Sequence, residues 1–422
     1  MWFRIVTGSF VFAIAAVLGI AISSKSVADA GIDVEFFGRI GVESQSFLQH
    51  GDHPNQRRRS YGVILEPEFY FETPAGSSFS LRPFYRYDSA DERRRHGDLR
   101  EAYFLWFGEA GNGEWELRLG IEQIFWGVTE TTNIVNIINQ SDLVEDLTEK
   151  EKLGQPMAHL TWSADWGVTE FFVLPYHRKR TYPGENGRFR SPLVVDNSEA
   201  SYENSKGKRH IDYALRYSHN IGLIDFGISG FSGTSRTPFL RPDISKPTPK
   251  LQPSKLLPYY GQIRQIGLDL QVTLEYWLLK LEAIRRKGAR NSSGVEEDYN
   301  AYIAGAERTF YSVFGSNTDI TALGEWVYDS RGPRSTESLD DDAFLGIRWA
   351  LNDTQDTEFV VGYVADSRYE SATLSAEFNR RISDEYSLEV ELFSVDRADV
   401  RDLNFYPINK DSNLSIRLYY HF

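Results

Sequence analysis

After residue 30, the chain alternates apolar side chains with polar or small ones in successive stretches of about 10–13 residues. In the last stretch one parity is apolar and the other mostly polar: Leu414, Ile416, Leu418, Tyr420 and Phe422 against Ser415, Arg417, Tyr419 and His421. Successive side chains of a strand point to opposite faces. The pattern therefore predicts strands with one face suited to lipid and the other to water, although a strand of a soluble sandwich would alternate in the same way.

Repetition of this stretch along the whole chain favours a membrane barrel. We predict eighteen strands, which begin near residues 32, 61, 78, 98, 114, 156, 166, 209, 222, 259, 276, 297, 319, 342, 357, 370, 385 and 412. Every second connection is short, at residues 73–77, 108–113, 164–165, 220–222, 274–276, 311–318, 352–356 and 383–384. The others are mostly long, at 49–60, 127–155, 177–208, 235–258 and 398–411. Such alternation is typical of outer-membrane barrels, which have short periplasmic turns and longer outer loops.

A closed barrel is also the membrane fold that the mature chain can form. No stretch after residue 22 approaches the ~20 apolar residues that a transmembrane helix needs. In lipid, only helices and closed barrels satisfy all their backbone hydrogen bonds. We therefore predict an all-β fold for residues 31–422, a single transmembrane up-and-down antiparallel β-barrel of about 18 strands, with 16 as the alternative.

Residues 1–30 have the features of a cleaved signal peptide. Arg4 supplies the positive charge, Phe10 to Ile22 supplies the apolar region, and Ala28-Asp29-Ala30 is a small-residue cleavage site. The alternative is an uncleaved anchor helix, because residues 5–22 are nearly long enough to span a bilayer. We expect export, cleavage and insertion into the outer membrane of a Gram-negative bacterium.

Composition fits this prediction and excludes other classes. Aromatic residues make up 14% of the chain and glycine occurs 33 times, which suits many short strands. Cysteine is absent, so neither disulfides nor thiolate metal sites can form. The net charge of −14 argues against a nucleic-acid partner. Neither a nucleophile elbow, a His-Glu-x-x-His motif nor a phosphate loop occurs, so we expect no enzyme activity, no cofactor and no metal.

Two segments resemble known families. Residues 413–422, which alternate and end in Phe422, look like the terminal strand of bacterial outer-membrane proteins. That resemblance implies that the barrel-assembly machinery recognises Phe422. The sequence Leu-Arg-Leu-Gly-Ile-Glu-Gln at 117–123, followed by Trp126-Gly127, is similar to a strand of porin-like families of the alginate-export type. It departs from them at Glu122, where a basic residue is usual.

Charged side chains on the strands are expected to point into the lumen, because Arg or Lys facing lipid costs about 2–4 kcal/mol at the bilayer midplane. The predicted pore-lining residues are Arg82, Arg86, Glu116, Arg118, Glu122, Asp212, Arg216, Arg348, Glu389, Glu391 and Arg417. One interpretation is a constriction whose basic and acidic sectors orient a passing solute. The other is that the charges pair across neighbouring strands and fill the wall of a wide pore.

Residues 128–154 form the most distinctive connection. Apolar side chains recur there at helical spacing, at Ile134, Ile137, Ile138, Leu143, Val144 and Leu147. Because an apolar stripe should avoid bulk water, we predict that this loop folds into the barrel and narrows it. The predicted constriction residues are Asn133, Asn136, Asn139, Asp142 and Glu145. The alternative is that the loop packs on neighbouring outer loops or at an oligomer contact.

The predicted function is passive diffusion of small hydrophilic solutes through an outer-membrane channel. Two alternatives stay open: a channel for export or uptake of polysaccharides or hydrophobic compounds, and an adhesin or receptor that acts through its loops. Expected partners are small polar solutes, outer-membrane lipid and lipopolysaccharide. The arginines at 57–59 and 93–95 would bind lipopolysaccharide phosphates or attract anionic solutes; the alternative is that they are solvated loop charges with no special role. A homotrimer is the alternative to a monomer. The proline-rich segment 237–258 is predicted to form a semi-rigid extended loop.

Overall fold

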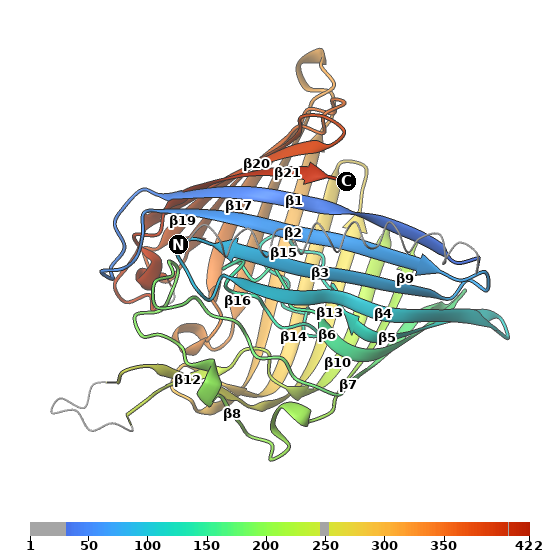
Figure 1. The fold of residues 1–422 in the computed structure, drawn as a ribbon, viewed down its shortest axis with the longest axis horizontal. Coiled ribbons are helices and arrows are strands. Elements are labelled where there is room, and N and C mark those ends of the chain that lie inside the picture. The colour runs from blue at the N-terminus through green and yellow to red at the C-terminus, as the bar shows by residue number, and fades with distance from the viewer. Residues whose placement is uncertain (1–30, 245–252, 404) are drawn as a thin grey trace, which may run out of the picture.

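One closed barrel of 18 strands makes up most of the protein. The computed structural model describes residues 31–244, 253–403 and 405–422, so the predicted signal peptide at 1–30 lies outside the described residues. Neighbouring barrel strands are antiparallel, and β1 pairs with β21 to seal the barrel. Figure 1 shows the barrel from the side, with β1 in blue beside β21 in red. The all-β barrel that the sequence predicts is confirmed.

Each barrel strand begins within three residues of its predicted start, because the alternation that identifies a strand also marks where it enters the sheet. The barrel strands are β1 (Asp33–Phe47), β2 (Arg59–Glu72), β3 (Ser78–Asp88), β4 (His96–Ala110), β5 (Gly113–Glu122), β6 (Gln155–Ala164), β7 (Gly167–Leu174), β9 (Asp212–Ile221), β10 (Ile224–Thr234), β13 (Gln262–Thr273), β14 (Trp277–Arg290), β15 (Glu296–Phe310), β16 (Asp319–Asp329), β17 (Asp341–Ala350), β18 (Glu358–Asp366), β19 (Ala372–Arg381), β20 (Tyr386–Arg397) and β21 (Asn413–His421).

The two faces of the barrel wall differ as the alternation predicts. In β21 the apolar side chains Leu414, Ile416 and Leu418 are 36–43% exposed on the outer face. Ser415 and Tyr419, between them on the inner face, are only 2% and 3% exposed. An apolar outer face suits hydrocarbon. The backbone also suits it, because every strand edge is already paired within the closed sheet. Within the described residues, no helix has the length and apolarity to cross a membrane.

The connections divide the barrel into two ends. At the short-turn end, the strands are joined by residues 73–77, 111–112, 165–166, 222–223, 274–276, 311–318, 351–357 and 382–385. At the long-loop end, the longest connections are 48–58, 123–154, 175–211, 235–261, 330–340 and 398–412. Three connections at the long-loop end, 89–95, 291–295 and 367–371, are also short.

A second, three-stranded sheet covers part of the long-loop end. It consists of β8 (Ser201–Tyr202), β11 (Phe239–Pro242) and β12 (Leu256–Tyr260). The described part of the proline-rich segment is therefore a paired hairpin rather than a free extended loop, because its apolar residues at 239–240 and 256–257 form strands. Single-turn 3₁₀ helices complete the described connections: η1 (Asn197–Glu199), η2 (Gly207–Arg209), η3 (Val313–Gly315), η4 (Gly332–Arg334) and η5 (Tyr406–Ile408).

Candidate functional site

The first part of loop 128–154 is bound to the inner face of β14. Glu282, which is fully buried, accepts hydrogen bonds from the backbone N–H groups of Val128 and Thr129 at 2.8 and 3.2 Å. The same carboxylate accepts from the Thr129 hydroxyl, from the Asn133 amide at 3.0 Å and from the Val135 N–H at 3.2 Å. One strand carboxylate therefore satisfies five donors of a loop that leaves the barrel wall at β5.

The next residues of the loop contact β16 and β17. Glu325 on β16 accepts hydrogen bonds from the N–H groups of Glu130 and Thr131, both at 2.8 Å. The side chain of Glu130 lies 2.8 Å from Lys280 Nζ and 3.3 Å from Arg348 Nη2. Burial alone would raise the pKa of Glu130, but the hydrogen bond and charge of Lys280, with help from Arg348, lower it.

The middle of the loop reaches the other side of the lumen. Glu145 Oε2 lies 2.6 Å from Arg86 Nε on β3. The carbonyl oxygen of Val144 accepts a hydrogen bond from Arg94 Nε at 3.0 Å. Counted around the sheet, β3 lies eight and ten strands from β16 in the two directions, so it stands nearly opposite β16 in the closed barrel. The loop therefore crosses the lumen from one wall to the other.

The residues just before this contact, 139–142, are fixed beside β4 and β5. Asp142 is fully buried and lies 2.8 Å from Arg100 Nη2, 3.3 Å from His96 Nε2 and 2.7 Å from the Thr181 hydroxyl. Burial would raise the pKa of Asp142, but its hydrogen bond with His96 and the charge of Arg100 outweigh burial and lower the pKa to about 2. Asn139 accepts from the Ile124 N–H at 2.8 Å and donates to backbone carbonyls.

Apolar residues of the loop fill one side of the lumen. Val135, Ile137 and Ile138 are at most 3% exposed and pack in one cluster with inward side chains of β6, β7, β9, β10 and β13 to β15, among them Phe172 and Phe231. The helical spacing of these apolar residues does not produce a helix. Residues 128–154 instead adopt turns and isolated bridges. Side-chain acceptors on the strands take up the loop's backbone donors, so the loop needs no helix to satisfy them.

The other side of the lumen is a cavity of about 1780 Å³. Its lining includes the loop and inward residues of β1 to β3 and β13 to β21. It extends from Glu358, the first residue of β18 at the short-turn end, to Leu193 and Tyr406 in connections of the long-loop end. A cavity of this length along the barrel is the candidate solute path.

Charges of both signs line this cavity and are linked to one another. Glu43 on β1 accepts hydrogen bonds from Arg86 at 2.7 Å, Arg94 at 3.0 Å and Arg417 at 2.8 Å. Arg417 also donates to Glu391 at 2.6 Å. The side chain of Glu391 remains 43% exposed, whereas that of Glu43 is 1% exposed. The three arginines therefore surround the buried carboxylate of Glu43, while the carboxylate of Glu391 faces the cavity.

The structure brings some of the predicted residues together and separates others. Cavity-lining residues among them are Arg86, Arg348, Glu389, Glu391, Arg417, Asn133, Asn136, Asn139 and Glu145. Six predicted pore residues and Asp142 are not in that lining. Five of the six pair with neighbours on the wall: Arg82 with Glu101, Arg118 with Glu116 and Glu122, and Arg216 with Asp269. Asp212 binds Arg236 at 2.9 Å.

Several residues of the site carry no local sequence signal for their role. Glu282 and Glu325 share the inward parity of their strands, which identifies them as lumen residues but not as acceptors for loop 128–154. Arg39 lies among the cavity-lining residues, 3.6 Å from Glu389, and its guanidinium stacks 4.4 Å from the Tyr419 ring centre. Glu130 and Lys280 pair across 150 positions of the chain, and alternation within one strand says nothing about such distant contacts.

Most of this chain matches the model of a protein family. A family model described as "Protein of unknown function (DUF1302)" matches residues 42–391. The chain belongs to this DUF1302 family. The family description says nothing about porins of the alginate-export type, so the similarity at residues 117–127 stays a prediction. No curated protein matches the sequence significantly.

Solved structures with a similar outline include two engineered variants of the Rhodopseudomonas blastica porin. One aligns with a TM-score of 0.43 at 10% identity, and the other with a TM-score of 0.42 at 10% identity. Each alignment covers 92% of this DUF1302 chain and 100% of the porin chain. These scores are too low to support an inference about solute or mechanism.

Proposed function

We propose that this DUF1302 protein is a channel of the bacterial outer membrane through which small hydrophilic solutes diffuse passively. The observation that carries the proposal is the cavity between loop 128–154 and the barrel wall, whose lining charges remain partly exposed. Side chains of Arg39, Arg348 and Glu391 are 32–43% exposed there. Solvated charges of both signs favour polar or dipolar solutes, because they replace part of the hydration that the solute loses.

Loop 128–154 is proposed to form the constriction. Because it crosses the lumen and fills one side with apolar residues, solutes would pass along the charged side. The apolar outer face supports a position in lipid, and the long-loop end would face the cell exterior. The cleaved leader at 1–30, lipopolysaccharide contacts and recognition of Phe422 by the assembly machinery remain parts of this proposal.

Conductance with single introduced cysteines tests the proposal, because the chain has no cysteine of its own. Glu391→Cys places a thiol on the cavity, whereas Leu418→Cys places one on the lipid face of the neighbouring strand. In planar bilayers, a bulky water-soluble thiol reagent should lower the conductance of Glu391→Cys and leave Leu418→Cys unchanged. Mature protein that inserts but never conducts would contradict the channel and favour a loop-based receptor.

A second candidate function is transport of amphipathic or hydrophobic compounds. The specific observation is a group of apolar side chains on the same cavity near the long-loop end: Leu193, Phe189, Phe393, Leu403, Phe405 and Tyr406. Such a surface would hold the apolar part of a solute while the charged wall meets its polar part. Liposomes that contain the protein separate the candidates, because only the second predicts that Phe393→Ala slows entry of an amphipathic dye more than entry of a sugar.

A further inference from the structure

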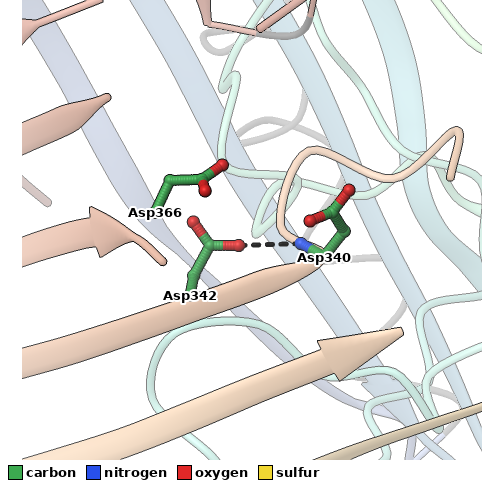
Figure 2. A group of neighbouring side chains, drawn as sticks. All are labelled: Asp340, Asp342 and Asp366. Atoms are coloured by element: carbon green, nitrogen blue, oxygen red, sulfur yellow. Dashed lines mark hydrogen bonds between the residues drawn. The ribbon is translucent and has the colours of Figure 1, made fainter. Parts of the chain in front are cut away.

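Three carboxylates meet at the long-loop end of the barrel, and none of them is part of the cavity lining. Asp340 ends the connection between β16 and β17, Asp342 is the second residue of β17, and Asp366 is the last residue of β18. One oxygen from each lies within 4.8 Å of the others. Figure 2 shows the three side chains, from two adjacent strands and the preceding loop, pointing toward one another.

Asp342 holds a buried carboxylate oxygen without a partner in the described part of the chain. The residue is 1% exposed. Its Oδ2 accepts hydrogen bonds from the N–H groups of Asp340 and Asp341 at 2.7 and 3.1 Å, whereas Oδ1 has no hydrogen-bond partner. In Figure 2 this free oxygen points toward Asp366. A buried carboxylate oxygen left without a donor costs free energy, and a cation between it and another carboxylate would offset that cost.

Among the described residues, no cationic side chain pairs with Asp342 Oδ1. Arg368 is the nearest, with Nε 3.7 Å from Asp340 Oδ1 and Nη2 3.4 Å from Asp341. Burial raises the pKa of Asp340; the charge of Arg368 opposes this and the charge of Asp366 adds to it. The neighbouring carboxylate of Asp329 is different, because Arg331 binds it directly at 2.6 Å.

We propose that Asp340, Asp342 and Asp366 bind a divalent cation, Ca²⁺ by preference. Ca²⁺ takes carboxylate, carbonyl and water oxygens at about 2.3–2.6 Å, so oxygens within 4.8 Å of one another can share one ion. Three protein carboxylates and a neighbouring arginine give a weak site, in the ~0.1–1 mM range of extracellular Ca²⁺ modules. The ion would tie connection 330–340 to the turn at 367–371 and stiffen this part of the rim.

The test uses full mature protein refolded into detergent without lipopolysaccharide, because Ca²⁺ would otherwise bind lipid phosphates. Millimolar CaCl₂ should raise the unfolding temperature by a few degrees, chelator should reverse the rise, and Tb³⁺ should bind with sensitised luminescence that Ca²⁺ displaces. Asp342→Asn should abolish both effects. Asp341→Asn removes the same charge from the adjacent residue outside the trio, and it should retain them.

A purely structural role for Asp342 predicts that Asp342→Asn lowers the unfolding temperature in chelator. If the carboxylate serves a cation, Asp342→Asn without Ca²⁺ should unfold at the wild-type temperature or above it, because it removes an uncompensated buried charge. Asp366→Asn serves as a second variant if Asp342→Asn does not refold. Absence of any Ca²⁺ or Tb³⁺ response in the wild type, or an undiminished response in both variants, would overturn the site. Neither readout depends on whether the barrel conducts.

Discussion

The carboxylate of Glu145 lies 2.6 Å from the guanidinium of Arg86, with both side chains at most 6% exposed. This contact joins the middle of loop 128–154 to β3, while Glu282 holds the beginning of the same loop on β14. The loop is therefore attached to both sides of the lumen. In the proposed channel, the position of this loop would set the width of the solute path, so substitutions at its contacts should change the conductance while the barrel stays folded.

Removal of the Glu282 carboxylate should loosen the start of the loop. Glu282→Ala leaves the N–H groups of Val128, Thr129 and Val135 without their acceptor, and each unsatisfied buried donor costs about 1–3 kcal/mol. We expect noisier single-channel currents and faster tryptic cleavage after the exposed Lys150. Glu282→Gln is the matched control, because an amide oxygen can still accept most of these bonds. Equal cleavage rates for wild type and Glu282→Ala would show that Glu282 does not hold the loop.

Substitution of Arg417 should change ion selectivity. Arg417 contacts the buried Glu43 and the cavity-lining Glu389 and Glu391, so Arg417→Gln leaves these three carboxylates with less compensating charge. The preference for cations over anions should rise roughly twofold or more. Reversal potentials in a KCl gradient measure this. Arg241→Gln, at an exposed arginine of β11 in the three-stranded sheet, should leave the reversal potential unchanged.

The buried pair of Asp142 and Arg100 predicts a loop that is insensitive to moderate acid. The folded-state pKa of Asp142 is lowered to about 2, so its stabilising contribution is complete above the unfolded value of about 3.9. That contribution is lost as the pH falls from about 4 through about 2. Loss of the Asp142 carboxylate should therefore add no gating noise to single-channel currents between pH 8 and about pH 5, and the noise should appear near pH 3.

Asp142→Asn provides the matching variant for this pH dependence. It removes the carboxylate that lies 2.8 Å from Arg100, which is only 4% exposed, and breaking such a buried pair costs about 3–5 kcal/mol. The variant should show the noise of the acidified wild type already at neutral pH. If its conductance and noise matched the wild type at pH 7, the contact would not restrain the loop.

The last residue should matter more for assembly in cells than for stability. The backbone of Phe422 exchanges two hydrogen bonds with Gly38, at 3.0 and 3.1 Å, and Phe422→Ala retains them. The substitution removes the ring that lies 5.1 Å from the ring of Phe36, a loss of about 2 kcal/mol. We expect several-fold less folded barrel in cell envelopes, measured by heat-modifiable gel mobility, but normal refolding in detergent. Leu418→Ala, at another lipid-facing position of the same segment, should assemble normally.

The sequence predicts the barrel well because alternation is a local property that each strand carries. Its parity in β21, for example, also separates the exposed Leu418 from the cavity-lining Arg417. Contacts of loop 128–154 are not local. Val128 and Glu282 are 154 positions apart, and no sequence pattern around either residue predicts their contact. For the same reason, parity places Arg216 inward but cannot tell that Asp269 on another strand binds it at 2.6 Å.

The pairing of β1 with β21 joins Arg39 to His421 and Phe47 to Asn413, so the last two sheet edges to meet are separated by nearly the whole chain. Until they meet, both ends of the growing sheet present unpaired N–H and C=O groups that would associate with any other extended peptide. Closure therefore comes late, after synthesis of the final strand, and a long polypeptide must be kept from aggregation until then. A chain of this design depends on protection of its open sheet edges until the final strand pairs with the first.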